Sequence, residues 1–477
     1  MNVLNHDKPI HKYFETITRI PRGSKNEKQM SNYLVNFAKE HQLDYIQDEI
    51  GNVIIYKKGS IGYEEHPTVM LQGHMDMVCE KNRDIDFDFE HDALNLYIED
   101  GWLKAKGTTL GADDGYAISY MLSILESDDY AHPPLECVFT VQEEIGLIGA
   151  KNLKVEYFQS QRLIGMDSGG ENQTTISCSG GRRNQITKVM NCINSNMNTF
   201  QLTINGLQGG HSGSCINKER GNAIKIMARI LNELNNETTI HLIKIDGGLK
   251  ENAIPRECEV IFAADISLKW LEHLLKKIYK DIYEEFQYSD QGLHFHISQL
   301  SKADKVCDKQ TSQEVIDLLM ALPNGMHNHS MVISGLVTCS NNIGVIHLEN
   351  EHLEIQSSIR SPIQEMRDYI SQQYSIIAHL CHAQSEDRAD YPGWNYEGES
   401  QMRSLYENVI QEKLNKPLET IASHGGIEVG VLKGLIPNLD IITLGPLCKN
   451  AHTPDEQMNL SSFEKMFDVL VSLLAQL

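Results

Sequence analysis

The stretch TVMLQGHMD (residues 68–76) decides the fold of this chain. Its first five residues form a short, largely apolar run, which predicts a strand buried on both faces of an α/β sheet. The run ends at a glycine, after which His74 and Asp76 stand two residues apart. Residues with this spacing point to the same face of a strand, so the Asp76 carboxylate can fix the tautomer of the His74 imidazole. A lone His-x-Asp pair is weak evidence of chemistry, and its meaning depends on the rest of the chain.

Two more apolar runs of this kind end in acidic residues. CVFTVQ at 137–142 precedes Glu143 and Glu144, and LIGM at 163–166 precedes Asp167. The carboxyl ends of neighbouring strands in an α/β sheet line the crevice in which such proteins bind ligands. We therefore expect these acids to lie close to the histidine of the first run.

The segment GTTLGADDG (107–115) runs into an apolar helical pattern. Its glycines permit a tight turn, and Asp113 and Asp114 fall near the N-terminus of the helix, where the dipole and the free amides favour an ionised carboxylate. Helix capping is one interpretation of these acids. An aspartate that bridges two cations is the other, and it also explains an acid in so short a loop.

These residue types match the ligands of a metal site. His452 follows LGPLCKNA (444–451), which gives the chain a second histidine behind an apolar segment. Zinc accepts imidazole nitrogen and carboxylate oxygen, and a catalytic zinc site keeps one position open for water. The side chains of Glu143 and Glu144 diverge, so one can bind metal while the other acts as a general base. The sequence therefore predicts a paired metal site in a hydrolase.

The alternation of helical patterns and apolar runs predicts an α/β fold that is interrupted by an insertion. Helical patterns and buried runs alternate over residues 1–185, and this texture returns over residues 391–477 after a turn-rich joint. Between them, the looser alternation of apolar and polar residues over residues 186–390 predicts strands with one solvated face, interleaved with amphipathic helices. We expect a discontinuous catalytic domain with a mixed, mostly parallel sheet flanked by helices, plus an inserted α+β lid domain. The last helix is expected to begin with a capping box at Ser461.

Size and composition restrict the class of protein. A chain of 477 residues suggests two or three domains, and its formal charge of -23 argues against a nucleic-acid partner. The N-terminal segment has no apolar core of a secretory signal, and no run is long enough to span a membrane. The ten scattered cysteines never form Cys-x-x-Cys, which favours reduced thiols in a cytoplasmic protein.

Five motifs in order resemble a known family over essentially the whole chain. They are GHMDMV (73–78), LGADDG (110–115), EEIGLIGA (143–150), MDS (166–168) and AHTPDE (451–456). The chain is similar to the dinuclear-zinc metallopeptidases of the carnosinase and carboxypeptidase G type, and within them to the aminoacyl-histidine dipeptidases. The resemblance implies two zinc ions, one held by His74 and Asp167 and the other by Glu144 and His452. It also implies that Asp113 bridges them, that Asp76 supports His74, and that Glu143 is the base.

Family-like segments also occur in the insertion, at 209–213, 252–255 and 358–361, and the segment HGGIE (424–428) after the insertion resembles the loop of the family that lies along the substrate backbone. By resemblance, His211 and Asn252 would polarise the scissile carbonyl, Arg360 would bind the free carboxylate of the substrate, and Gly426 would lie next to its backbone. A bidentate guanidinium suits a carboxylate, although a plain salt bridge is the alternative for Arg360. Asp114 stands where relatives often have asparagine, and its added negative charge makes manganese or cobalt acceptable beside zinc.

The resulting hypothesis is hydrolysis of dipeptides, with Xaa-His substrates such as β-alanyl-histidine preferred and other dipeptides accepted. The alternatives are an N-acyl amino acid deacylase or a tripeptidase with the same chemistry, and a non-catalytic relative that binds peptide or metal. A phosphoesterase is disfavoured, since the chain lacks a glycine-rich phosphate loop with lysine. The insertion either pairs with a second subunit in a homodimer or, if internally duplicated, covers the site alone.

Overall fold

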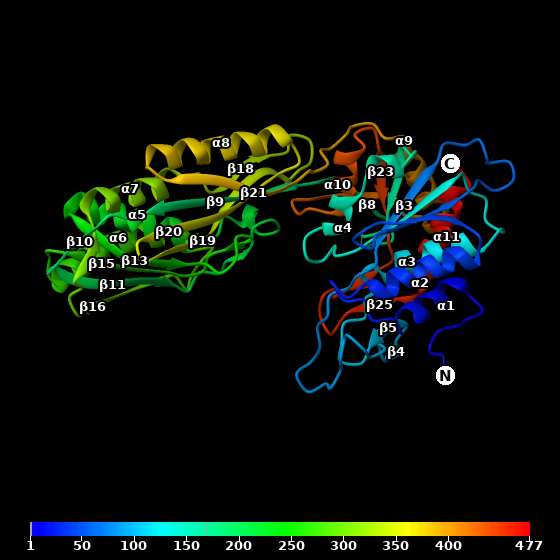
Figure 1. Ribbon diagram of the computed structural model, residues 1–477, viewed down its shortest axis with the longest axis horizontal. Coiled ribbons are helices and arrows are strands. Elements are labelled where there is room, and N and C mark those ends of the chain that lie inside the picture. The colour runs from blue at the N-terminus through cyan, green and yellow to red at the C-terminus, as the bar shows by residue number, and fades with distance from the viewer. Residues whose placement is uncertain (1, 169) are drawn as a thin grey trace. The chain divides into compact units, whose positions relative to one another are not determined.

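The computed structural model describes residues 2–168 and 170–477, which form two compact units (Figure 1). Unit 1 contains residues 1–177, 394–422 and 427–477, and unit 2 contains residues 178–393 and 423–426. These units are defined by their internal contacts, so the domain limits expected at residues 185 and 390 stay a prediction. No described helix is both long and apolar enough to cross a membrane.

Unit 1 is built on a mixed sheet whose central strands are parallel. Its strands are, in sheet order, β1 (Asp44–Gln47), β2 (Val53–Lys57), β6 (Leu135–Thr140), β3 (Val69–His74), β7 (Arg162–Gly165) and β23 (Asp440–Thr443). β3 runs parallel to β6 and β7, and β23 runs parallel to β7. β2 is antiparallel to both of its neighbours, β1 and β6. The predicted α/β class with a mixed, mostly parallel sheet is confirmed.

Helices cover both faces of this sheet. Successive residues of its strands point to opposite faces, so both sets are buried. Leu71 and Phe139 belong to the main core, and their neighbours Met70 and Val138 are equally inaccessible on the other face. The helices are α1 (Pro9–Ile17), α2 (Lys28–Glu40), α3 (Ala112–Glu126), α4 (Ile148–Asn152), α9 (Gln401–Leu414), α10 (Glu428–Leu435) and α11 (Leu460–Leu474), with a 3₁₀ turn at Val155–Tyr157. This double cover explains why the strands read as continuous apolar runs.

Smaller sheets complete unit 1. One has the order β24 (Cys448–Lys449), β25 (Gln457–Asn459), β5 (Trp102–Ala105) and β4 (Leu96–Glu99), and β22 (Glu419–Ser423) pairs with β8 (Gln173–Cys178). The capping box expected at Ser461 is wrong. Asn459 is the N-cap of α11, and its side chain accepts a hydrogen bond from the Ser462 amide at 2.9 Å.

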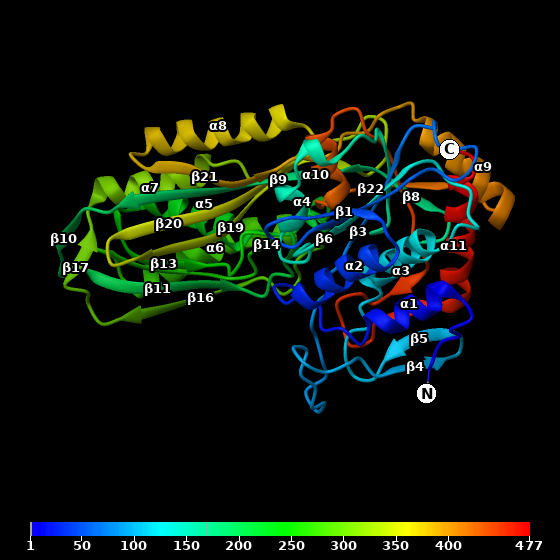
Figure 2. The ribbon, with the colours of Figure 1, turned by 45° about the vertical axis from the view of Figure 1, so that its right-hand side comes forward.

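Unit 2 contains one large sheet with four helices. The strands are, in sheet order, β16 (His294–Leu300), β11 (Asn198–Asn205), β15 (Cys258–Ala264), β13 (Ile240–Gly247), β19 (Val337–Glu349), β20 (His352–Ser361), β9 (Gly180–Val189) and β21 (Gln384–Tyr391), with β18 (Gly325–His329) beside β19. The helices are α5 (Ala223–Glu237), α6 (Leu268–Phe286), α7 (Lys309–Ala321) and α8 (Gln364–Leu380). Buried and accessible residues alternate over the first half of β20, residues 352–357, as expected for a sheet with one solvated face, whereas residues 357–361 are all buried. Figure 2 shows the strands of this sheet and the helices beside it.

The large sheet of unit 2 consists of two similar halves. The first half runs β11, α5, β13, β15, α6, β16, and the second consists of β9, α7, β19, β20, α8, β21. The sheet order of the first half, β16-β11-β15-β13, is repeated in reverse by the second as β19-β20-β9-β21, and the halves meet where β13 pairs with β19. The insertion is therefore internally duplicated, with the first half inserted between β9 and α7 of the second.

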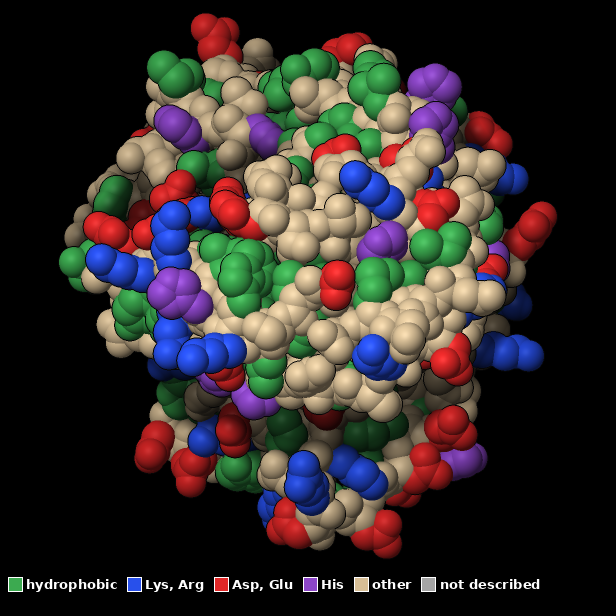
Figure 3. Space-filling view, turned by 90° about the vertical axis from the view of Figure 1, so that its left-hand side faces the viewer, with side chains coloured by type: hydrophobic (Ala, Val, Ile, Leu, Met, Phe, Trp, Pro, Cys, Tyr) green, Lys and Arg blue, Asp and Glu red, His purple; other side chains and the backbone are tan. Residues whose placement is uncertain are grey.

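Short ribbons and turns connect these elements. β10 (Cys192–Asn194) pairs with β17 (Lys305–Cys307), and β12 (Gly210–His211) pairs with β14 (Ala253–Ile254), while a 3₁₀ turn spans Ile216–Lys218. On the face drawn in Figure 3, basic and acidic side chains are interspersed rather than separated by sign.

Candidate active site

Two histidines of unit 1 face the same carboxylate. His74 ends β3, and its Nε2 lies 2.9 Å from Oδ1 of Asp113 at the start of α3. His452 approaches the other oxygen, with Nε2 3.1 Å from Asp113 Oδ2. The peptide bond between Asp113 and Asp114 is cis. Asp113 thus stands between two imidazoles that are 378 positions apart in the sequence (452 minus 74).

The turn after β6 adds two glutamates that Asp76 holds in place. The Glu143 amide donates to Asp76 Oδ1 at 3.0 Å, and the Glu144 amide donates to Asp76 Oδ2 at 3.3 Å. The contact with His74 differs from the expected one. His74 Nδ1 lies 3.1 Å from the backbone carbonyl oxygen of Asp76 and 3.5 Å from its carboxylate. The carboxylate therefore positions mainly the glutamate turn.

Asp167, which follows β7, adds to a dense cluster of negative charge. Burial raises the pKa of Asp167 to about 7, and the nearby charge of Asp113 contributes to the shift. Burial likewise raises the pKa of Glu143 to about 9, with Asp167 as the next cause. Acids crowded in this way repel one another unless a cation lies among them.

The donor atoms fit a divalent metal ion. Ligand atoms of His74, Asp113 and Glu144 lie within 4.8 Å of one another. Within the described part of the chain no group hydrogen-bonds to the buried Glu144 Oε1, although His452 Nε2 lies only 2.9 Å away. His452 Nε2 and Glu144 Oε1 are therefore close enough to bind the same cation. Imidazole and carboxylate together are a donor set typical of zinc.

The histidines also respond to the acids. Burial alone would lower the pKa of His74, but hydrogen bonds to Asp113 and Asp76 raise it well above its ordinary value. The hydrogen bond to Asp113 and the adjacent carboxylate of Glu144 raise the pKa of His452 to about 10. Without a metal the cluster therefore binds protons, and metal binding has to displace them.

Asp114 contributes less negative charge than expected. Its side chain is fully buried, and its Oδ2 accepts a hydrogen bond from the His74 amide at 3.2 Å. Burial raises its pKa well above the usual value for an aspartate, which favours the neutral carboxyl. In this state Asp114 is similar to an asparagine, which is also neutral.

The loop before Asp113 depends on a glutamate to which the sequence assigned no role. Glu456 is buried, and its carboxylate accepts hydrogen bonds from the four consecutive amides of residues 110–113, at 2.7, 2.9, 2.8 and 3.2 Å. Arg22 is also buried and donates to the carbonyl oxygens of Met75 and Asp76, each at 3.0 Å, and of Gly111. Arg22 thereby joins the end of β3 to the loop that carries Asp113.

Glu428, at the start of α10, is a second buried acid without an assigned role. Its Oε2 accepts hydrogen bonds from Gln72 of β3 at 2.6 Å and from Thr140 of β6 at 2.5 Å. It therefore joins the two strands that lead to His74 and Glu143. No local pattern within residues 424–428 indicates that the Glu428 side chain joins these two strands.

The four predicted substrate-binding residues all lie in unit 2, and the structure brings them together there. Arg360 of β20 is only 8% exposed, and its Nη2 lies 3.5 Å from His211 Nε2. The Asn252 carbonyl oxygen accepts a hydrogen bond from the Ser212 amide at 2.8 Å, beside His211. Among the described residues, no acidic group forms an ion pair with Arg360, which disfavours the salt-bridge interpretation.

Gly426 packs against a ring that reaches Arg360. A Cβ at this glycine would lie 2.4 Å from Tyr391 Cε2, and the Tyr391 hydroxyl lies 3.5 Å from Arg360 Nη1. His424, on the same loop, contacts Ser340 Oγ through its Nε2 at 2.6 Å. The loop 423–426 is therefore part of the same group of residues.

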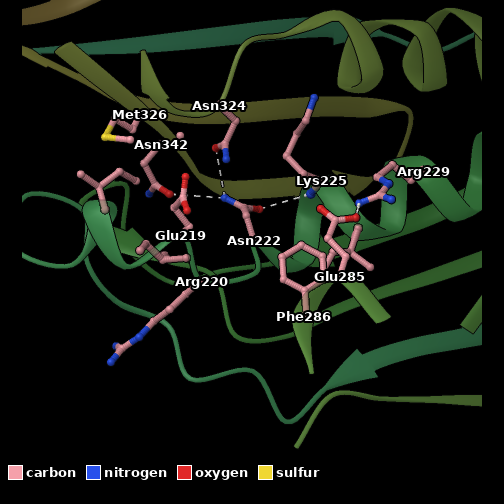
Figure 4. A pocket seen from close by; sticks show the side chains of 14 residues that line it. Glu219, Arg220, Asn222, Lys225, Arg229, Glu285, Phe286, Asn324, Met326 and Asn342 are labelled. Atoms are coloured by element: carbon pink, nitrogen blue, oxygen red, sulfur yellow. Dashed lines mark hydrogen bonds and ion pairs between the residues drawn. The ribbon is translucent and has the colours of Figure 1, made fainter. Parts of the chain in front are cut away.

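A separate pocket in unit 2, of about 340 Å³, lies among residues that were not predicted (Figure 4). Several of its polar side chains already have partners within the chain. Asn222 donates to Asn324 and Asn342, Lys225 donates to carbonyl oxygens at the end of α7, and Arg229 pairs with Glu285 at 2.7 Å. None of the four predicted substrate-binding residues lines this pocket.

Comparison with known proteins agrees with this geometry. Residues 70–476 match peptidase family M20/M25/M40. The chain belongs to this family. It is 33% identical to the cytosol non-specific dipeptidase of Escherichia coli over 98% of its length and 97% of that protein. It is also 33% identical to the aminoacylhistidine dipeptidase of Vibrio alginolyticus, whose crystal structure it matches with a TM-score of 0.91 over 98% of this chain and 96% of that one.

A more distant solved structure is similar in fold. The aminopeptidase PepT of Bacillus cereus is 16% identical, with a TM-score of 0.56 and 99% of both chains covered. As a member of the M20/M25/M40 peptidases, the chain is a hydrolase that acts on peptide bonds, as predicted. The family resemblance inferred from the five motifs is confirmed.

Proposed function

We propose that this peptidase hydrolyses dipeptides with the help of two divalent metal ions, with a preference for Xaa-His substrates such as β-alanyl-histidine. The observation that carries the proposal is the Asp113 carboxylate, which offers one oxygen toward His74 and the other toward His452. The names of the two relatives support a dipeptidase, one for aminoacyl-histidine substrates and one without strict specificity.

In this proposal His74 and Asp167 hold one ion, Glu144 and His452 hold the other, and Asp113 is shared. Zinc suits this mixture of imidazole and carboxylate, and manganese or cobalt are acceptable substitutes. Bound there, the ions would supply Lewis acidity toward the scissile carbonyl and the attacking water. Crowding of acids around Asp167 supports the presence of cations, because their charge would relieve the repulsion that raises the pKa values.

Glu143 would transfer the proton. As an ionised carboxylate it takes a proton from the attacking water and delivers it to the leaving amine. Burial is the main cause of the raised pKa of Glu143 and the charge of Asp167 is the next, so cations beside these acids would favour the ionised form of Glu143. Asp76 fixes the Glu143 amide at 3.0 Å and so positions this base.

Arg360 would bind the C-terminal carboxylate of the dipeptide. Its guanidinium is buried, and no described acidic residue pairs with it, so an anion from outside the chain can take this place. Burial lowers the pKa of His211, and the charge of Arg360 lowers it further, so the neutral imidazole is favoured. His211 Nδ1 accepts a hydrogen bond from the Gly213 amide at 3.2 Å, which leaves its Nε2–H to polarise the substrate carbonyl together with Asn252.

A substrate panel tests the assignment against its rivals. The metal-reconstituted protein would be assayed on β-alanyl-histidine, other dipeptides, a tripeptide and an N-acetyl amino acid. We expect turnover of the dipeptides with a free amine and a free carboxylate. Preferential cleavage of the N-acetyl amino acid would reassign the chain as a deacylase, and preferential cleavage of the tripeptide would reassign it as a tripeptidase.

A Glu143→Gln variant tests the base and excludes a role in binding alone. It should retain both metal ions by elemental analysis and lose about 10²- to 10⁴-fold in kcat, the usual contribution of a general base. Glu156, on the 3₁₀ turn of the same unit, gives the matched control Glu156→Gln, which should be fully active. Near-normal turnover by the Glu143 variant would refute the assignment.

The name of the Escherichia coli relative also supports a compartment. That protein is a cytosol dipeptidase, and a cytoplasmic location for this chain fits the ten cysteines, among which the described structure has no disulfide. Fractionation of cells with an antibody against the chain would test the location.

A further inference from the structure

Two cysteines of unit 2 stand directly opposite each other in a two-stranded ribbon. β10 and β17 are neighbouring antiparallel strands (Figure 2). Their register pairs Cys192 with Cys307. Two pairs of the same register are joined by backbone hydrogen bonds. The Asp308 amide donates to the Asn191 carbonyl at 2.8 Å, next to the cysteines, and the Ser195 amide donates to the Asp304 carbonyl at 2.9 Å, three positions further along. Hydrogen-bonded and non-hydrogen-bonded pairs alternate along such a ribbon, which makes Cys192 and Cys307 a non-hydrogen-bonded pair.

This kind of pair has the geometry that a disulfide needs. Non-hydrogen-bonded pairs place their Cα atoms about 4.5 Å apart, inside the range of about 4.4–6.8 Å for disulfides. The two Sγ atoms lie 3.9 Å apart, so a disulfide requires an approach of about 2 Å. Rotation of the two short side chains can supply this movement without a change in the ribbon.

The two thiols differ in accessibility. Cys192 is partly exposed, and Cys307 is 2% exposed. Burial raises the pKa of Cys307 to about 12, and the adjacent Cys192 contributes to the shift. A soluble oxidant therefore reaches Cys192 first, and Cys307 is placed behind it as the second sulfur.

The position in the fold gives the pair a structural consequence. β10 links β9 to β11, and β17 links β16 to α7, so the two cysteines mark the entrance and the exit of the inserted first half of the sheet. They are 115 positions apart in the sequence. A bond between them would close the whole inserted half into one covalent loop, which restricts the unfolded chain more than a short loop does.

We propose that Cys192 and Cys307 are an oxidation site that forms a reversible disulfide on reaction with a peroxide. The Cys192 thiolate attacks one peroxide oxygen, which forms a sulfur–oxygen bond and breaks the oxygen–oxygen bond. The Cys307 sulfur then attacks the Cys192 sulfur, a sulfur–sulfur bond forms, and the oxygen leaves. With hydrogen peroxide, the two thiols together lose two electrons and two protons, the peroxide is reduced, and two molecules of water are released. A dithiol reverses the reaction by thiol–disulfide exchange.

The experiment uses the full-length folded protein and hydrogen peroxide at a few equivalents. After exposure, free thiols are blocked, the protein is denatured and digested without reduction, and the peptides are identified by mass spectrometry. We expect the ten thiols of the chain to fall to eight, with residues 192 and 307 in one linked pair, and dithiothreitol to restore ten. Retention of ten thiols, or a pairing that involves other cysteines, would overturn the proposal.

Two variants distinguish this pair from general oxidation. Cys192→Ser should leave Cys307 as a free thiol after the same treatment, whereas Cys79→Ser, which removes an exposed cysteine of unit 1, should form the same disulfide as the natural chain. The unfolding temperature of the oxidised natural chain should rise, and that of oxidised Cys192→Ser should not. A linked Cys307 in the Cys192→Ser variant would contradict the assignment. None of these measurements depends on peptidase activity.

Discussion

The Glu456 carboxylate accepts a hydrogen bond from the backbone amide of Asp113 at 3.2 Å. Together with three bonds from the preceding amides, this contact fixes the loop in which Asp113 lies between the two histidines. Glu456 ends the motif that contains His452, so one short segment supplies both a proposed metal ligand and the anchor of the shared one.

The first prediction concerns Glu456→Gln. This change preserves the shape of the side chain but weakens charge-assisted hydrogen bonds to the loop, so Asp113 is held less firmly. Residues that orient metal ligands typically contribute about 10- to 100-fold in metal affinity. We expect a loss of that size in a titration with zinc, and partial recovery of activity in excess metal. Asp455→Asn, at the exposed neighbouring position, is the control, and equal metal affinity in both variants would contradict the prediction.

The second prediction concerns Arg360. Arg360→Lys should lower kcat/KM for dipeptides by about 10- to 100-fold, because a lysine cannot make a bidentate contact and a charged hydrogen bond contributes about 1.5–3 kcal/mol. A dipeptide amide lacks the carboxylate, so the natural chain and the variant should cleave it at similar rates. An equal loss on both substrates would show that the change acts on the fold instead.

The third prediction compares two adjacent glycines. A Cβ at Gly426 would lie 2.4 Å from the Tyr391 ring, whereas at Gly425 the nearest atom is Ser423 Oγ at 3.2 Å. Gly426→Ala must therefore displace the ring that reaches Arg360, and we expect a rise in KM of about tenfold, which corresponds to about 1.4 kcal/mol. Gly425→Ala should have a smaller effect. The steady-state kinetics of both variants decide the comparison.

The fourth prediction concerns pH and His424. Burial lowers its pKa to about 3 in the folded chain, and the charge of Arg360 contributes. The unfolded chain binds this proton below about pH 6.5, so stability is highest above that pH. As the pH falls from 6.5 toward 3, His424 should reduce the free energy of unfolding by up to about 1.4 kcal/mol per pH unit.

Urea unfolding between pH 4.5 and 7.5 measures this slope. His424→Asn should show a shallower decrease toward acid than the natural chain, whereas His352→Asn, on an exposed strand position of the same unit, should keep the natural slope. An unchanged slope in the His424 variant would mean that its imidazole is protonated in the folded chain.

Local patterns were sufficient for the parts of the site that depend on one strand and the residue after it. β3, β6 and β7 could be predicted because strands buried on both faces are apolar throughout, and their polar ends place His74, Glu143 and Asp167 at one edge. The contact between His74 and Asp76 was predicted from their spacing. The dominant partner of the Asp76 carboxylate was not, because the amides of residues 143 and 144 reach it only after β6 has paired with β3.

The sequence by itself determined the family, the α/β class and the residue types that gather at the site, because strand patterns and the order of motifs are local properties of the chain. Only the tertiary structure assigned the anchoring roles of Arg22, Glu428 and Glu456, revealed the two halves of the unit 2 sheet, and left Arg360 buried without an acidic partner. Arg22 and Glu456 both contact Gly111, which is 89 positions from Arg22 and 345 positions from Glu456 in the sequence. A buried charged group needs hydrogen-bond partners, and tertiary packing brings these partners from distant parts of the chain. No local sequence pattern predicts which distant group will be the partner.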